Sequence, residues 1–318
     1  MKKKVGTRQD PIKESLLKTS VSSKKDIFGK SLSLFFLVLI GLVVFAILYF
    51  VISRGLMSFT LDKINPFKFI FGTNWSPNSK DINGNLQFGA LPMIVGSFSV
   101  TILSALIATP FAIATALFMV ELQPSWGKKI MQPVIELLVG IPSVVYGFIG
   151  LTIIVPFIRN SFGGSGSSIL AGTIVLFVMI LPTITSLTVD ALNNVPSFYK
   201  ETSLAIGATR WQTIYKVILR AATPGILTAI VFGMARAFGE ALAVQMVVGN
   251  STVMPKSLLT SASTLTSVLT EGIGNTTDGS PQNDALWTLA MLLLLMSLFF
   301  NSLVHYIGKR TNINQGGN

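Results

Sequence analysis

Six long apolar stretches divide this 318-residue chain, and each offers the roughly 20 apolar residues that a helix needs to cross a lipid bilayer. Hydrophobic residues make up 50% of the chain and charged residues only 12%, whereas soluble proteins carry about 25% charged residues. The sequence therefore predicts an all-α integral membrane protein with six transmembrane helices. The predicted spans are Ser33 to Ile52, Ser97 to Val120, Val134 to Phe157, Ile169 to Val189, Ile226 to Val248 and Ala285 to Ile307.

The positions of the basic residues orient these spans. With the N-terminus placed in the cytoplasm, 17 of the 24 Lys and Arg residues fall in inner segments, six fall in outer segments, and Arg236 lies inside a span. Cytoplasmic segments of membrane proteins carry such an excess of positive charge, so both termini are predicted to be cytoplasmic. The net charge of +11 then reflects topology and anionic lipid, and no nucleic-acid partner is expected.

The chain divides into two tails and one transmembrane domain. Residues 1–30 are rich in lysine and lack apolar periodicity, so we predict a basic cytoplasmic tail there. Residues 31–310 form the transmembrane domain, with a cytoplasmic loop at 190–222, and residues 311–318 form a second, short tail. Two predicted outer loops are long enough to have a function of their own, Arg54 to Ala90 and Gly249 to Asp284.

Proline residues lie within or at the ends of several predicted spans. Each removes a backbone hydrogen bond and clashes with the preceding turn, so these helices are expected to kink. The segment Gly140 to Gly150, GIPSVVYGFIG, favours a broken helix that lines a pathway. The alternative is that proline and glycine are simply common in membrane helices. The prolines concerned are Pro110, Pro142, Pro156 and Pro182.

The loop between spans four and five, Asp190 to Ala222, has the signals of a helical hairpin. Ser197 follows a proline and is predicted to cap a first helix, which Gly207 can end in the left-handed conformation. Thr209 and Gln212 then form a capping box that begins a second helix. Two short helices joined at a glycine are therefore expected.

Apolar residues recur in this hairpin at spacings of three or four, which indicates that one helical face packs against something. Either that face docks on a partner protein, or it covers the ends of the transmembrane bundle. Periodicity alone does not separate the two interpretations. The residues are Phe198, Leu204, Ala205, Ala208, Trp211, Ile214, Tyr215 and Ile218.

Arg236 and Glu240 form a charged pair deep in the fifth predicted span. Four residues apart, they would share one face of a helix and lie within reach of each other. A charge in lipid costs at least about 2.5 kcal/mol, so both side chains are expected to face the protein interior or water. One interpretation is an internal ion pair that stabilises helix packing. The hypothesis we prefer is an anion pathway, because the planar guanidinium suits tetrahedral oxyanions and stays charged.

Glu240 favours phosphate among the oxyanions. Monohydrogen and dihydrogen phosphate carry an O–H donor near neutral pH, whereas sulfate does not. We expect Arg236 to attract the anion, and Glu240 either to accept its proton or to neutralise the arginine between turnovers. Glu136, near the inner end of span three, and Ser143, in the GIPS segment, are further candidates for the pathway. For Glu136 an exposed position at the membrane interface is the simpler interpretation.

The sequence offers no site for catalysis or for a bound cofactor. It has no Ser/His/Asp arrangement, no paired catalytic carboxylates and no Gly-x4-Gly-Lys-Ser/Thr phosphate loop. It also has no cysteine and a single histidine, which leaves no set of metal ligands. We therefore expect a transport subunit rather than an enzyme.

The hairpin resembles the EAA loop of ABC importer permeases, whose pattern runs Glu-Ala-Ala, three residues, Gly, nine residues, Ile, one residue, Leu-Pro. Glu201, Gly207, Val217 and Leu219 occupy the matching positions. In that family the loop inserts into a groove of a cytoplasmic ATPase subunit. The resemblance implies a MetI-like fold of six transmembrane helices and a partner that hydrolyses ATP, with Glu201, Gly207 and Leu219 in the coupling. The departures from the pattern are Thr202, Ser203 and Arg220.

A wider resemblance, over roughly Ser97 to Asn250, connects the chain with the PstC-type permeases of phosphate ABC importers. It rests on three segments together: ELLVGIPSVVYGFIG, VDALNNVPSFYKETSLAIGATRW, and RAFG followed by EALAVQMVVGN. It implies one half of the translocation pathway of an ATP-driven phosphate importer in the bacterial plasma membrane. The implied partners are a second, homologous permease, ATPase subunits and an extracytoplasmic phosphate-binding protein. A permease for sulfate or molybdate, and an ion-coupled secondary transporter, remain as alternatives.

Overall fold

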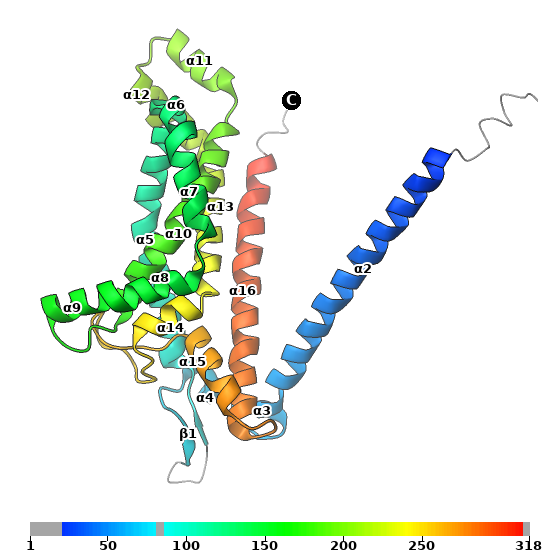
Figure 1. Cartoon of the computed structure of the whole chain (residues 1–318), viewed down its shortest axis with the longest axis vertical. Coiled ribbons are helices and arrows are strands. Elements are labelled where there is room, and N and C mark those ends of the chain that lie inside the picture. Colours follow the sequence, from blue (N-terminus) through cyan, green and yellow to red (C-terminus); the bar gives the residue numbers. More distant parts are fainter. Residues whose placement is uncertain (1–20, 81–85, 314–318) are drawn as a thin grey trace, which may run out of the picture. The chain divides into compact units, whose positions relative to one another are not determined.

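The computed structural model describes residues 21–80 and 86–313, which are mostly helical (Figure 1). Six helical segments are long and apolar enough to cross a membrane, which confirms the predicted number of spans. Most of the predicted basic tail, and the last five residues of the chain, lie outside the described residues. The six segments are Phe28–Thr60, Leu91–Leu122, Ser143–Phe162, Ile169–Asn193, Arg210–Phe238 and Pro281–Leu303.

The chain forms two units, which divide after Ser53. The described part of the first unit is a single helix, α2 (Val21–Gly55), which runs on into the second unit at its last two residues. It begins earlier than the predicted end of the tail at residue 30, because the lysines of this stretch do not interrupt the helix. Its long apolar run explains its length.

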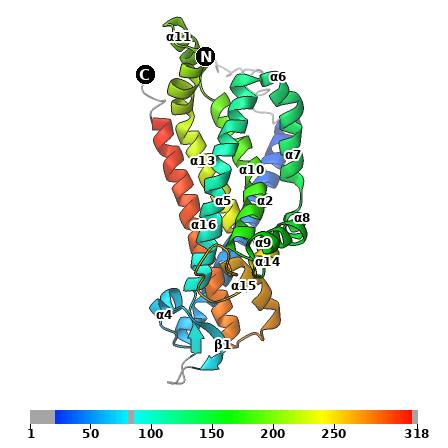
Figure 2. The ribbon, with the colours of Figure 1, turned by 90° about the vertical axis from the view of Figure 1, so that its left-hand side faces the viewer.

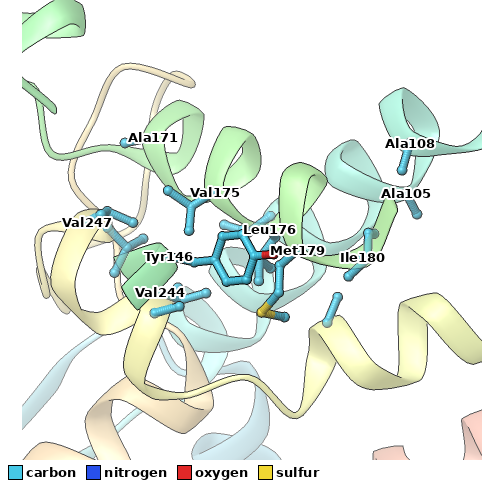
Figure 3. Packing of buried hydrophobic residues seen from close by; sticks show 14 of the residues in the cluster. Ala105, Ala108, Tyr146, Ala171, Val175, Leu176, Met179, Ile180, Val244 and Val247 are labelled. Atoms are coloured by element: carbon cyan, nitrogen blue, oxygen red, sulfur yellow. The ribbon is translucent and has the colours of Figure 1, made fainter. Parts of the chain in front are cut away.

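The second unit is built around four long helices that run side by side (Figures 1 and 2). Helix α5 packs along α10, α13 packs against both, and α16 packs against α13. Small buried residues on α5, among them Ala105, Ala108 and Ala112, face this core and allow close helix approach. Met179 and Ile180 of α10 fill its centre (Figure 3). The bounds are α5 (Leu91–Leu117), α10 (Ile169–Asn193), α13 (Leu219–Phe238) and α16 (Pro281–Ile313).

The predicted third span is broken, as the GIPS segment indicated. Helix α7 (Gln132–Gly140) ends where Ile141 and Pro142 adopt extended backbone conformations, and α8 (Ser143–Ile149) begins directly afterwards. The predicted span of Val134 to Phe157 is therefore wrong in its bounds, and the candidate span is Ser143–Phe162. In Figure 1 this segment runs across the bundle rather than along it. It comprises α8, the π-helical turn η3 (Gly150–Ile154) and α9 (Val155–Phe162).

A second short helix, α14 (Leu242–Val248), packs on α8. Gly147 permits this contact, since a Cβ atom added there would lie 2.8 Å from Cα of Ala243. The predicted fifth span, Ile226 to Val248, is also wrong in its bounds: helix α13 ends at Phe238, and α14 is separate. A continuous apolar run does not distinguish one spanning helix from a spanning helix followed by a buried crossing helix.

Further helical elements lie in the connections between these helices. Helix α5 continues through the π-helical turn η1 (Phe118–Leu122) and returns to α7 through α6 (Pro124–Trp126) and η2 (Gly127–Met131). The loop that leads from α10 into α13 carries the hairpin. Its elements are α11 (Ser197–Ala205), α12 (Arg210–Thr213) and the π-helical turn η4 (Ile214–Ile218).

The bundle end opposite the hairpin carries what we call the sheet-end module, residues 54–80, 86–88 and 265–289, which includes much of the first predicted outer loop and part of the second. Strand β1 (Trp75–Lys80) pairs antiparallel with β2 (Leu86–Phe88), Trp75 opposite Phe88. Phe69 contacts Phe59 and Trp75 edge-on, at ring-centroid distances of 5.9 and 6.3 Å. These rings join an apolar cluster with residues of α15 and α16. The helices are α3 (Met57–Thr60), α4 (Pro66–Phe71), α15 (Leu265–Gly272) and the 3₁₀ turn η5 (Ile273–Asn275).

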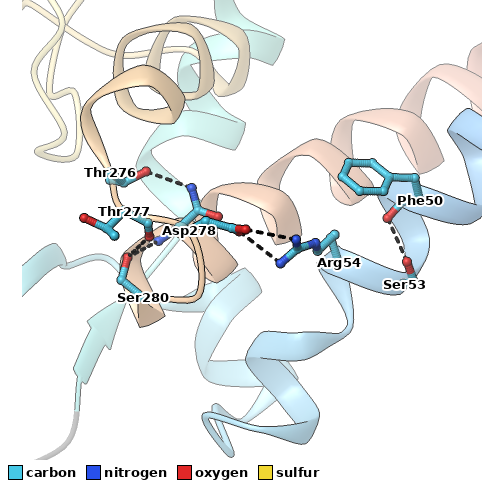
Figure 4. A network of polar contacts seen from close by, with 8 residues as sticks. Phe50, Ser53, Arg54, Thr276, Thr277, Asp278 and Ser280 are labelled. Atoms are coloured by element: carbon cyan, nitrogen blue, oxygen red, sulfur yellow. Dashed lines mark hydrogen bonds and ion pairs between the residues drawn. The ribbon is translucent and has the colours of Figure 1, made fainter.

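Polar contacts join the two segments of this module (Figure 4). Arg54 forms an ion pair with Asp278, 3.0 Å between Nη1 and Oδ1. Thr288 donates a hydrogen bond to the Gly55 carbonyl at 2.8 Å. Partial burial and the nearby carboxylate of Asp284 raise the pKa of Asp62 above its usual range. Both predicted outer loops thus contain ordered structure.

Candidate functional site

Arg236 lies in the last turn of α13 and is only partly exposed. Its Nη1 donates a hydrogen bond to Oγ1 of Thr183, which lies on α10 beside Pro182 and is buried. The arginine therefore faces a neighbouring helix of the protein, as the cost of a charge in lipid predicts. In the described part of the chain, no ion pair involves Arg236.

A close approach of two helices brings Arg236 to Thr183. Gly233 lies one turn before the arginine, and a Cβ atom added there would come within 2.5 Å of Cγ1 of Ile184. Only a glycine lets α13 come this near to α10. Because the two helices meet here, a long side chain on α13 reaches a hydroxyl on α10. Sequence reasoning did not identify Thr183, and its position after a proline within a span was the available signal.

Glu240 does not lie on the same helix as Arg236. Helix α13 ends at Phe238, and Glu240 lies in the connection to α14, where its Oε1 accepts a hydrogen bond from the Ala243 N–H at 3.2 Å. The backbone carbonyl of Glu240 accepts a second bond, from Thr266 at 2.8 Å. The expected pairing across one helical turn is therefore wrong. Helix α13 ends at Gly239, between the two charges, and the carboxylate instead accepts a hydrogen bond from the first turn of the next helix.

Tyr146 of α8 is a further polar residue of this region. It is buried in the apolar core to which α10 and α14 also contribute. Its hydroxyl donates a 2.8 Å hydrogen bond to the Leu138 carbonyl, across the break between α7 and α8. Residue 142 is a proline and has no N–H to donate to this carbonyl, which otherwise accepts only a long bond from the Ile141 N–H, at 3.4 Å. Ser143, the first residue of α8, lies at this same break and is half-buried.

Glu136 lies elsewhere. It is exposed on α7, and its Oε1 accepts a 3.0 Å hydrogen bond from Nε2 of Gln132, one turn earlier. This geometry agrees with the simpler interpretation, an exposed carboxylate on a helix surface. A role for Glu136 in the pathway remains a prediction.

The hairpin has the predicted glycine turn and the predicted second cap. Gly207 has a φ of 87°, in the left-handed region. Thr209 and Gln212 form the capping box, with the Gln212 N–H 3.3 Å from Oγ1 of Thr209 and the reciprocal bond at 2.9 Å. Ser197 is not the cap of α11: it is the first helical residue, and its side chain makes no capping bond.

The second helix of the hairpin is not short. The segment from Arg210 to Phe238 is one continuous candidate span, in which the π-helical turn η4 joins α12 to α13. Motion of the hairpin is therefore motion of the helix that carries Arg236.

The apolar residues of the hairpin divide into two groups. Ile214 and Ile218 are buried against the ends of α5 and α10, so this part covers the bundle. The larger side chains are exposed at the surface, and docking of these residues on a partner stays a prediction. The exposed group comprises Phe198, Tyr199, Leu204, Ile206, Trp211 and Tyr215.

The three residues predicted to take part in coupling also differ in their surroundings. Glu201 is exposed on α11, and Gly207 is exposed at the turn with open space around its Cα. Leu219 is partly buried and packs against the apolar cluster at the bundle end. Ser203, at one departure from the pattern, shares a 2.9 Å hydrogen bond with Thr213 that joins α11 to α12.

Comparison with known protein families accounts for this combination of spans and hairpin. The model of the family described as "Binding-protein-dependent transport system inner membrane component" matches residues 108–313, a stretch that includes the hairpin and Arg236. The chain belongs to this family. It is therefore a multi-pass inner-membrane permease of the ABC transporter type, a transport subunit without catalytic activity of its own. The family implies an ATPase partner and a binding-protein partner.

Individual relatives agree with the family. The probable ABC transporter permease protein YqgH of Bacillus subtilis (strain 168) is 55% identical over 269 residues, 84% of this chain and 86% of that protein. The phosphate transport system permease protein PstC of Mesorhizobium japonicum is 30% identical over 274 residues, 79% and 80% of the two chains. The PstC of Haemophilus influenzae is 29% identical over 279 residues, 80% and 86%.

A solved structure shows the same fold. A chain of the inward-facing MetNI methionine ABC transporter aligns with a TM-score of 0.51 and 19% identity, over 68% of this chain and 94% of that one. The predicted six-helix architecture of the MetI-like type is confirmed. Membership of a binding-protein-dependent family excludes the ion-coupled secondary transporter that the sequence left open.

Proposed function

We propose that this permease subunit forms one half of the pathway of an ATP-driven phosphate importer. The observation that carries the proposal is the state of Arg236, a partly buried guanidinium held by the neutral hydroxyl of Thr183. A partly buried cation that has no carboxylate partner among the described residues retains its attraction for an anion. The PstC proteins of several bacteria, which are 29–30% identical to this chain, support phosphate as that anion.

Glu240 contributes selectivity in this proposal. One of its carboxylate oxygens accepts the Ala243 N–H, and the group retains further acceptor capacity. Phosphate brings an O–H group that the carboxylate can accept, whereas fully ionised sulfate brings only acceptors. Arg236 and Glu240 therefore act from two elements, α13 and the connection to α14, rather than as one helical pair.

The exposed aromatic side chains of the hairpin form the docking surface for the ATPase subunit. Trp211 and Tyr215 lie on the helix that continues to Arg236, while Glu201 and Gly207 shape the first helix and its turn. Leu219 fixes that continuous helix to the bundle. A second, homologous permease completes the pathway, and an extracytoplasmic phosphate-binding protein delivers the anion.

Uptake of phosphate by reconstituted vesicles tests this function. The vesicles contain the permease pair, the ATPase and the binding protein, and sulfate and molybdate are added as competitors. Arg236→Gln should lower ATP-dependent phosphate uptake by about 30-fold or more, because a buried charge contact is lost. Arg236→Lys should retain part of the activity, since it keeps the charge without the planar fork. The exposed Arg220, on the same helix, supplies the control Arg220→Gln.

Two results would contradict the proposal. Normal phosphate uptake by Arg236→Gln would remove the arginine from the pathway. Uptake that sulfate or molybdate inhibits as well as unlabelled phosphate does would assign the permease to another oxyanion.

A further inference from the structure

We propose that the ion pair between Lys200 and Glu121 couples the hairpin to the second span, and that both are positioning residues for transport; this inference rests on the proposed function. Nζ of Lys200 lies 2.6 Å from Oε2 of Glu121. Lys200 belongs to α11, and Glu121 belongs to η1, the π-helical turn that ends the α5 span. The pair therefore joins two segments that lie 79 residues apart in the sequence.

Helix α11 has little other attachment to the bundle. Ser203 is its one buried residue in the described chain, and its packing neighbours are α12 and η4, which belong to the same hairpin. The hydrogen bond between Ser203 and Thr213 likewise stays within the hairpin. The large apolar side chains of α11 are exposed, so its apolar contact with the bundle is indirect, through η4. The ion pair provides a direct contact between α11 and the second span.

The two partners differ in exposure. The side chain of Lys200 is 46% exposed, whereas that of Glu121 is 9% exposed. An ion pair between two fully exposed side chains contributes little, because water solvates both charges. A carboxylate that is mostly withdrawn from water depends on its cation, and loss of the lysine leaves an uncompensated buried charge. Separation of Glu121 from Lys200 is therefore unfavourable, so Glu121 is expected to move with Lys200 when α11 moves.

From Glu121 a continuous series of contacts leads to Arg236. Helix α5 packs along α10 over most of its length, and α10 carries Thr183, the hydrogen-bond partner of Arg236. A hairpin displaced by its ATPase partner would act on the arginine from both sides. It would move α13 directly, through the continuous helix, and it would move α10 through Lys200, Glu121 and α5. The ion pair keeps the two movements in step.

The number of ATP molecules hydrolysed per phosphate transported tests the proposal in the reconstituted complex. Lys200→Met and Glu121→Gln should each raise this number about threefold to tenfold, the range typical of energetic coupling between sites. Lys200→Arg should keep it near the wild-type value. The charge-reversed double variant, Lys200→Glu with Glu121→Lys, should restore most of the loss. A purely structural role would alter complex yield or melting temperature without this pattern of rescue.

Lys216→Gln is the matched control, because Lys216 is an exposed lysine of the same hairpin without an ion pair in the described part of the chain. A wild-type ratio in Lys200→Met would overturn the inference. Loss of complex assembly in the single variants that the charge-reversed pair does not repair would overturn it as well. If the wild-type complex itself shows no ATP-dependent phosphate uptake, the proposed function fails instead.

Discussion

The two ends of the helical bundle differ in the burial of their aromatic residues. At the sheet end, Phe69, Trp75 and Phe88 contact one another edge-on and are covered by helices α15 and α16. At the hairpin end, Trp211 and Tyr215 are exposed, and polar contacts rather than apolar burial hold α11 in place. The sheet end thus covers its aromatic surface with other parts of the chain, whereas the hairpin end leaves an exposed apolar surface that suits a partner.

The largest expected effect is a loss of stability when a buried ring of the sheet end is removed. Phe69 is 1% exposed, and Phe69→Ala should lower the free energy of unfolding by about 3–5 kcal/mol, because it leaves a cavity and removes two ring contacts. Thermal unfolding in detergent measures the change. Phe67, on the same helix, is 75% exposed, so Phe67→Ala is the control and should change little. Equal losses in both variants would show that this end is not packed as described.

The next largest effect concerns the affinity of the hairpin end for the ATPase subunit. Trp211 is 64% exposed, so Trp211→Ala should leave the melting temperature nearly unchanged. It should weaken binding of the ATPase subunit by about 2 kcal/mol, roughly 30-fold, as expected for a tryptophan in the centre of an interface. Titration of the detergent-solubilised permease with the ATPase subunit measures the affinity. Phe71 is equally exposed at the sheet end, and Phe71→Ala should not affect this affinity. Unchanged binding in Trp211→Ala would remove the tryptophan from the docking surface.

The smallest expected effect is on the pH dependence of the melting temperature, through Asp62 at the sheet end. The folded protein raises the pKa of Asp62, so the stability that its protonation contributes is fully present below the usual pKa and is lost as pH rises through the raised one. At pH 7 the ionised carboxylate therefore destabilises the sheet end. Asp62→Asn should therefore raise the melting temperature at pH 7 by about 2–4 °C and flatten its dependence on pH between about 4 and 7.

Asp278 supplies the control for this variant. It is a carboxylate of the same module whose side chain is 72% exposed, and Asp278→Asn should produce no such gain because water already solvates its charge and Arg54 pairs with it. A lower melting temperature for Asp62→Asn at pH 7 would contradict the assignment.

Sequence reasoning predicted the number of spans and the local signals of the hairpin. Hydropathy identified the spans, and the box of Thr209 and Gln212 marked the start of a helix, because both signals act over a few neighbouring residues. It placed the bounds of spans three and five wrongly. In both cases an apolar run continued past a backbone break, at Pro142 in one and at Gly239 in the other.

The candidate site was predicted only in part. Arg236 was expected to avoid lipid, and it does contact a neighbouring helix. Its expected partner, Glu240, instead accepts a hydrogen bond from the first turn of α14, because helix α13 ends at Gly239, between the two residues. Thr183, Tyr146 and the pair of Lys200 with Glu121 were not anticipated.

The sequence by itself thus determined that this chain spans a membrane six times, that a capped hairpin interrupts it, and that a charged residue lies within its apolar part. Only the tertiary structure decided which groups meet, namely Arg236 with Thr183 and Lys200 with Glu121. The physical reason is that these partners lie 53 and 79 residues apart. Their meeting depends on how the helices pack and rotate against one another, through close approaches such as that of Gly233 to Ile184, and no local pattern encodes this packing.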